Sequence, residues 1–187
     1  MVFMTKLKVY VDFDSFCSSA VSADDLTASV CTAVDIFNTK ILKEQCKIDG
    51  FVMIVTTDET TANVVICKKH RAELELQGKL SVELIPSVSE MDGKNIYLDI
   101  LEIADVSSSY DKPFDDIVRE AVCHELCHVL GVDERIGLHR FGSKEYQQDF
   151  GLMLSPYNVY NSNLGKEYYL TDDEVAALKA SVSSIVA

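Results

Sequence analysis

The hydrophobic periodicity of the chain changes from two residues to about 3.6 and back, and this change limits the folds it can adopt. Residues 6–13 alternate apolar and polar side chains, as a half-buried strand does. Residues 23–45 then place apolar side chains at helical spacing behind Ser22, a residue suited to cap a helix. Further strands are predicted for four short, β-branched or alternating stretches, 51–57, 62–68, 79–86 and 95–100.

The C-terminal half predicts two more helices around an irregular segment. One helix begins near Pro113 and ends at Gly131, and the other covers residues 170–187, where Thr171 and Glu174 fit a capping box. Val175, Leu178, Val182 and Ile185 are expected to form the inward face of that last helix. We therefore predict an α+β fold in one domain, 1–187, with a mixed sheet backed by a long helix and the 113–131 helix. Residues 1–131 would form an N-terminal part and 132–187 a smaller C-terminal part.

Composition and charge exclude several classes of protein. The chain has 187 residues, 48% of them hydrophobic, and a formal net charge of −13, which disfavours nucleic acid and anionic membranes as partners. No apolar run approaches the roughly 20 residues that span a bilayer. The N-terminus does not resemble a signal peptide, so we expect a cytoplasmic monomer whose six cysteines are reduced, although secretion by another route stays open.

The stretch EAVCHELCHVLGVDER, residues 120–135, contains two of the four histidines of the chain. On a helix, His124 and His128 lie on one face, because each residue turns by about 100°. Both imidazoles can therefore reach one zinc ion, for which neutral histidine nitrogens are good ligands. Glu125 points elsewhere and would not bind the metal, but its carboxylate can act as a general base on a metal-bound water. The competing interpretation is a packed helix that contains two histidines by chance.

A zinc site needs at least one more protein ligand. Gly131 allows the chain to turn out of the helix, and Glu134 follows three residues later. A carboxylate is a competent zinc ligand, so Glu134 is the first candidate. Asp133 and His139 are the alternatives.

The pattern H-E-x-x-H-x-x-G-x-x-E resembles the zinc-binding segment of the metzincin metalloproteases, and HELCHVLGVDE is most similar to their matrixin-like branch. That family normally has histidine where this chain has Glu134. The resemblance implies a methionine turn beneath the metal, for which GLMLSPYNVY (151–160) offers Met153, and it places Tyr157 close to the substrate. It also implies the order strand, long helix, several strands, active-site helix, methionine turn and final helix.

The function implied by this resemblance is a zinc-dependent endopeptidase that acts on peptides or proteins. His124, His128 and Glu134 would bind Zn²⁺, and Glu125 would be the catalytic base. The alternatives are a zinc hydrolase or aminopeptidase with a different third ligand, and a non-catalytic binding module with a metalloprotease-like scaffold. The presence of Glu125 argues against the non-catalytic module.

Overall fold

The computed structural model describes residues 4–17, 21–70, 73, 87–89, 94–132, 152–153 and 168–186. Its strands form one sheet in the order β2-β1-β3-β5-β4. Four strands are parallel and β4 pairs antiparallel with β5, so the mixed sheet and the general α+β class are as expected. The strands are β1 (Thr5–Val11), β2 (Phe51–Thr56), β3 (Val64–Lys68), β4 (Ser87–Ser89) and β5 (Asn95–Leu98).

The first strand ends earlier than its alternating pattern predicts. Val9 and Val11 are buried on the helix-covered side, as expected. Asp12, however, caps the short helix α1 (Phe13–Phe16), because its carboxylate accepts a hydrogen bond from the Ser15 N–H at 3.2 Å. A side-chain cap stabilises a helix start, so Phe13 belongs to a helix and not to the strand.

The long first helix predicted for 23–45 is confirmed as α2 (Ala23–Ile36) followed without a break by a π-helical segment, η1 (Phe37–Gln45). Ser22 caps it, accepting from the Asp25 N–H at 3.4 Å. In η1 the turns widen, and the Cys46 N–H bonds to the carbonyl of Ile41, five residues back. The wider turns point the polar side chains of η1 at neighbouring segments of the chain.

The strand predicted at 95–100 is present but ends early, and between it and the histidine helix lies a helix that the sequence analysis did not predict. β5 ends at Leu98, and the Asp99 carboxylate then accepts hydrogen bonds from the backbone N–H groups of Leu101 and Glu102. This cap starts a further helix, α4 (Ile100–Tyr110). Its three consecutive serines resemble a loop in sequence, but Ile103 and Val106 are buried and hold the helix in place.

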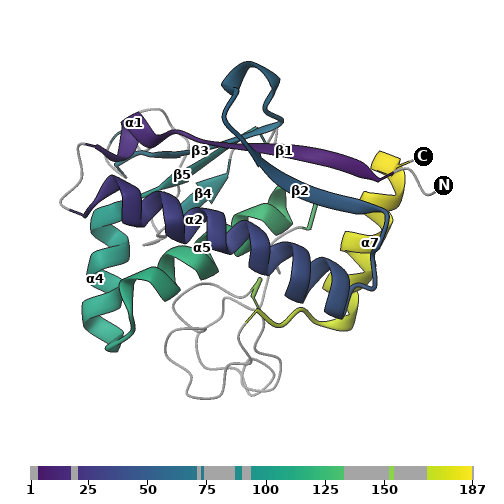
Figure 1. Cartoon of the computed structure of the whole chain (residues 1–187). Helices are drawn as coiled ribbons and strands as arrows, with labels where there is room; N and C mark the ends of the chain where they lie inside the picture. Colours follow the sequence, from purple (N-terminus) through teal and green to yellow (C-terminus); the bar gives the residue numbers. More distant parts are fainter. Residues whose placement is uncertain are drawn as a thin grey trace.

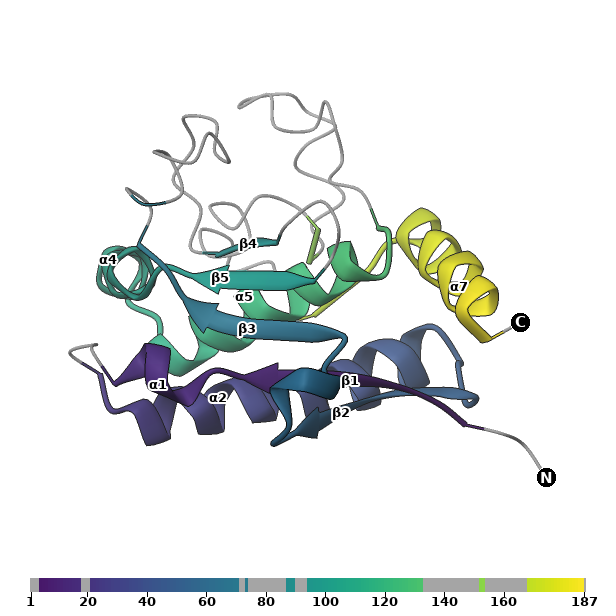
Figure 2. The same ribbon diagram turned by 90° about the horizontal axis from the view of Figure 1, so that it is seen from above.

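The histidine-bearing helix is α5 (Phe114–Val129), and it lies in the centre of the molecule (Figure 1). It begins after Pro113, as predicted. Figure 2 shows α2 and α5 running beneath the same face of the sheet, and α5 also contacts α4, β4 and β5. Every residue from Glu120 to Cys127 is buried, so α5 is enclosed on nearly all sides, as core helices are.

The C-terminal helix is α7 (Asp172–Val186), and its start is built partly as predicted. The Glu174 carboxylate accepts from the Thr171 N–H at 2.8 Å, which is one half of the expected capping box. Leu178 and Val182 are buried, but Ile185 is 45% exposed, so the inward face ends a turn early. The buried cluster joins Val9 of β1 with Leu178 of α7 in one core.

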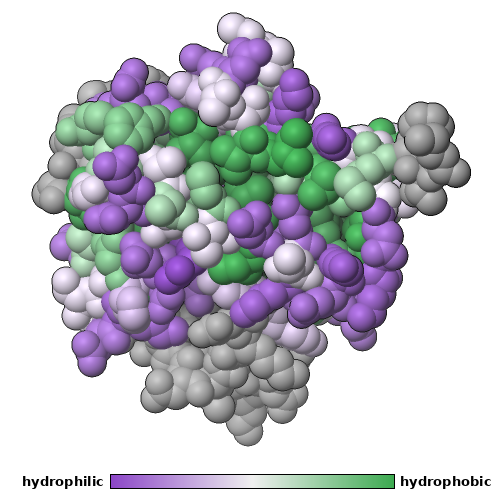
Figure 3. All heavy atoms as spheres, in the orientation of Figure 1, coloured by the Kyte–Doolittle hydropathy of each residue, from purple (hydrophilic) through white to green (hydrophobic). Residues whose placement is uncertain are grey.

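The predicted strand at 79–86 lies outside the described residues. Within the described part of the sheet, β2 and β4 are the edge strands. Figure 3 shows apolar residues gathered along β2, where Val55 is 43% exposed, above a more polar band over α2. None of the helices within the described ranges is both long and apolar enough to cross a lipid bilayer.

A glycine turn ends α5 at its C-terminus and also places a hydrogen-bond acceptor beside His128. Gly131 has φ +77, in the left-handed region. The Gly131 N–H bonds to the His128 carbonyl at 2.8 Å, and the Val132 N–H to the Cys127 carbonyl at 3.0 Å. This is the Schellman pattern, in which glycine avoids the steric penalty of a Cβ. It turns the carbonyl of Val132 back towards the helix.

We expect Gly131→Ala to lower the free energy of unfolding by about 1–2 kcal/mol, because an alanine there must adopt the left-handed conformation. The added Cβ meets Ser181 Oγ only at 3.5 Å, so the loss comes from the backbone and not from a clash. Urea denaturation measures it. Gly50→Ala is the control, since its Cβ meets nothing within 4 Å, and it should change stability by less than about 0.5 kcal/mol. Equal losses in the two variants would contradict the explanation.

Candidate metal centre

The two histidines of α5 converge on one point, as the helical spacing predicts. His124 is 5% exposed and His128 is partly buried. Their ring centroids lie 4.6 Å apart with the planes at 83°, and the two Nε2 atoms are separated by 3.0 Å. Both imidazoles therefore present the same nitrogen to the same small volume.

The other nitrogen of each ring is bound to a backbone carbonyl. His124 Nδ1 lies 2.8 Å from the carbonyl oxygen of Leu152, and His128 Nδ1 lies 2.7 Å from that of Val132. A carbonyl oxygen only accepts hydrogen bonds, so each Nδ1 must carry the hydrogen. In the neutral rings, both Nε2 atoms are then left with a lone pair.

Two lone pairs that face each other at 3.0 Å repel, and a positive centre between them would relieve that repulsion. A shared proton is one solution and a metal cation is the other. Two nitrogens bound to one tetrahedral zinc at about 2.0–2.1 Å are about 3.3 Å apart, which is close to the observed separation. The carbonyl bonds at Nδ1 are also the outer contacts that hold ligating histidines in proteins. The pair therefore fits zinc in the separation of its Nε2 atoms and in its outer contacts.

Glu125 follows His124 directly and is almost fully enclosed, with 2% of its surface exposed. A buried carboxylate acts in a low-dielectric environment, where its charge has a long reach. The Cys127 thiol is one of the groups that this charge affects. Burial raises the pKa of that thiol well above its ordinary value, and the charges of Glu174 and Glu125 are among the groups that add to the shift.

The two cysteines that flank the histidines pack as thiols, as expected. Cys123 and Cys127 are fully buried and free, and the Cys123 thiol lies 3.4 Å from the carbonyl of Ala33. Burial raises the pKa of Cys123 as well. Since the thiolate is the form that binds metals, neither residue competes with the histidines at neutral pH.

The remaining predicted site residues divide into two groups. Met153 is fully buried beside Leu152, whose carbonyl contacts His124, so the 152–153 turn lies against the histidine pair. Asp133, Glu134, His139 and Tyr157 fall outside the described residues, and their roles stay predictions. Among the residues whose placement is described, no three of the types His, Cys, Asp or Glu form a cluster able to hold a metal.

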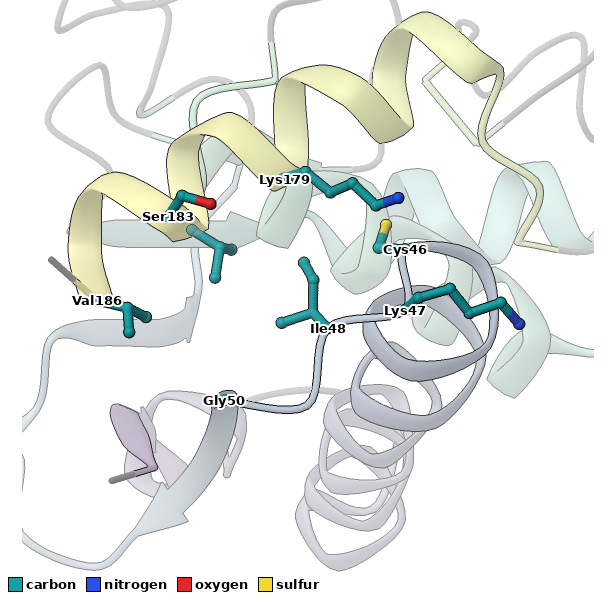
Figure 4. A pocket seen from close by; sticks show the side chains of 8 residues that line it. Cys46, Lys47, Ile48, Gly50, Lys179, Ser183 and Val186 are labelled. Atoms are coloured by element: carbon teal, nitrogen blue, oxygen red, sulfur yellow. The ribbon is translucent and has the colours of Figure 1, made fainter. Parts of the chain in front are cut away.

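A separate hollow of about 520 Å³ lies between α7 and the loop after η1 (Figure 4). Lys47, Ile48, Lys179 and Ser183 are among the residues that line it, and neither histidine does. It therefore does not belong to the candidate metal centre.

Two contributors to the site were not predicted from the sequence. The carbonyls of Leu152 and Val132 fix the histidine tautomers, yet every residue has a carbonyl and none marks its own position. Gly131 is an indirect signal for Val132, because the glycine turn directs that carbonyl. Nothing in the sequence indicates Leu152, which lies 28 residues from His124.

The comparisons with known proteins add no assignment. No protein-family model matches the chain, and no curated protein matches it either. The interpretation of the site therefore depends on its geometry.

We expect the purified protein to bind about one zinc ion per chain, and His124→Ala and His128→Ala to weaken binding by more than the 10–100-fold typical of residues that only orient a ligand. Plasma mass spectrometry and chelator competition measure content and affinity. His70→Ala is the control, because His70 is exposed and distant in sequence from α5. If the wild type binds no zinc, the pair shares a proton and the metal interpretation is wrong.

Proposed function

We propose that the chain is a zinc-dependent endopeptidase of the metzincin type. The observation that carries the proposal is the approach of two Nε2 lone pairs to 3.0 Å while both Nδ1 atoms are bound to carbonyls. A helix packed without a metal has no need to direct the Nε2 atoms of two histidines at one point. The adjacent Glu125 completes the set of groups that metal-assisted hydrolysis uses.

The zinc would be held by Nε2 of His124 and of His128, with Glu134 as the proposed third ligand and Asp133 or His139 as alternatives. When bound, the ion would polarise the scissile carbonyl and make water more acidic. Three protein ligands would leave a position open for solvent. A carboxylate as third ligand would also bring negative charge that balances the cation.

Glu125 is the proposed general base. Its carboxylate would take the proton of the attacking water and later pass it to the departing amine. Burial suits this role, because a carboxylate shielded from bulk solvent keeps the proton close to the reacting atoms. We propose Tyr157 as a second catalytic group, which would donate a hydrogen bond to the oxygen of the scissile carbonyl as charge develops there.

The substrate would be a peptide in extended conformation. In the described sheet, β4 is an edge strand, runs antiparallel to β5 and contacts α5. An extended peptide can add to such an edge through main-chain hydrogen bonds, and so lie near the histidines. The strand that the sequence predicts at 79–86 comes directly before β4 in the chain, and we propose it as part of the same edge. We propose that the enzyme acts as a monomer.

The order of elements supports the metzincin type. A strand and a long helix come first, strands follow, and the histidine helix, the 152–153 turn and the final helix come last. Helix α4 is an addition to that order. A zinc aminopeptidase, or a binding module without catalysis, would share the same scaffold, and an assay of cleavage position separates them.

We expect Glu125→Gln to keep the zinc content of the wild type and to lower peptide hydrolysis by about 10²–10⁴-fold, the usual contribution of a general base. Glutamine has the same size but cannot take up the proton. Mass spectrometry of an unfolded protein substrate gives both the rate and the cleavage positions. Glu174→Gln is the matched control, because Glu174 is also buried but caps α7.

The cleavage positions decide between the candidate functions. Internal cuts support the endopeptidase, and stepwise loss of N-terminal residues supports an aminopeptidase. A zinc-loaded wild type that leaves a broad peptide library intact would show that the endopeptidase proposal is wrong.

For the third ligand, we expect Glu134→Ala to lose most of the bound zinc, while Asp133→Ala and His139→Ala keep it. Removing one ligand opens the coordination sphere and lowers the affinity. Glu134→His should restore binding, since histidine is the ligand that the metzincin pattern has at this position. Unchanged zinc content in Glu134→Ala, with a loss in either of the other two variants, would assign the ligand to that residue instead.

A further inference from the structure

Gln45, the last residue of η1, pairs its side-chain amide with a backbone segment far away in the sequence. Its Nε2 donates to the carbonyl of Tyr168 at 2.6 Å, and its Oε1 accepts from the Leu170 N–H at 2.9 Å. One amide thereby fixes two backbone groups, two residues apart, as a neighbouring strand would.

The segment that Gln45 holds has an unfavourable backbone conformation. Tyr168 has φ +58, in the left-handed region that residues with a Cβ seldom adopt. Such conformations persist where the surroundings determine them. Here the Gln45 amide fixes the backbone on both sides of Tyr169, and the Lys40 ammonium lies 5.2 Å from the centre of the Tyr168 ring.

The held segment in turn fixes the outer contact of His124. The carbonyl of Tyr169 accepts from the Leu152 N–H at 2.6 Å. The carbonyl of Leu152 accepts from His124 Nδ1 at 2.8 Å. Hydrogen bonds, joined by short stretches of backbone, therefore connect Gln45 through residues 168–170 and Leu152 to the imidazole of His124.

We infer that Gln45 is a positioning residue of the candidate metal centre, which acts through Leu152 to keep the hydrogen of His124 on Nδ1, so that Nε2 is the nitrogen directed at zinc. The inference rests on the proposed function in so far as zinc is the ligand. The preferred tautomer of His124, however, is a property of the metal-free protein and can be measured there.

The chain offers a matched control on the same π-helical segment. Asn38 pairs its side-chain amide with the backbone of Met53 in the same way, donating to the carbonyl at 2.8 Å and accepting from the N–H at 2.9 Å. Its two hydrogen bonds reach β2 and not the 168–170 segment. Each of the variants Asn38→Ala and Gln45→Ala therefore removes one side-chain amide and its two hydrogen bonds to the backbone. Only Gln45→Ala breaks the connection to His124.

The test uses the metal-free full chain and long-range ¹H–¹⁵N NMR of the histidine rings at pH 8. In the wild type and in Asn38→Ala we expect His124 with a protonated Nδ1 and an unprotonated Nε2. In Gln45→Ala we expect a substantial fraction of the other tautomer. An unchanged His124 in Gln45→Ala, or the same change in both variants, would overturn the inference.

A second readout is zinc affinity by chelator competition, where Gln45→Ala should bind about 10–100-fold more weakly than the wild type and Asn38→Ala should not. If Gln45→Ala does not fold, Gln45→Glu takes its place. It keeps the acceptor for Leu170 but loses the donor to Tyr168. It should shift the His124 tautomer in the same direction as Gln45→Ala, but to a smaller extent. A wild type with the expected tautomer but no zinc binding would refute the proposed function alone.

Discussion

Two backbone carbonyls determine which ring nitrogens His124 and His128 can present to a ligand. Because the oxygens of Leu152 and Val132 can only accept, they hold one hydrogen on each Nδ1 and leave the Nε2 lone pairs facing each other at 3.0 Å. The helical spacing brings the rings together, but it does not select the tautomer. Without the carbonyls, the same two residues could satisfy each other through an ordinary N–H···N hydrogen bond, and no cation would be needed.

The rest of the fold holds these carbonyls in place. α5 is enclosed by α2, α4 and the sheet, so the rings have little freedom to turn away. The left-handed Gly131 directs Val132 back to His128, and the Schellman hydrogen bonds fix that turn. Gln45 and the 168–170 segment do the same for Leu152. A site built in this way is oriented before any ligand arrives.

Periodicity and capping predicted the elements that have a strong local pattern. The alternation of β1, the helical spacing of α2 and η1, and the Pro113 and Gly131 boundaries of α5 could all be read from the sequence. Helix α4 could not, since its serines match a loop and its start depends on one Asp99 side chain. Ile185 fits the helical pattern but is 45% exposed, which the pattern does not indicate. The HExxH motif indicated the histidines and Glu125, and Gly131 indirectly indicated the Val132 contact, whereas the Leu152 contact arises from tertiary structure and leaves no signal in the sequence.

The two histidines differ in how much of the chain must fold before each is oriented. The partner of His128 is four residues away and forms with the end of α5 itself. The partner of His124 is 28 residues away and is held by a segment that depends on η1, which lies more than 120 residues earlier in the chain. The His124 ring therefore takes its position only when the C-terminal part has docked against the long first helix. A cation that needs both nitrogens would bind only this docked state, and its binding free energy would then add to the stability of the C-terminal part. The orientation of the two histidines thus depends on the packing of both parts of the chain, although the histidines themselves lie on a single helix.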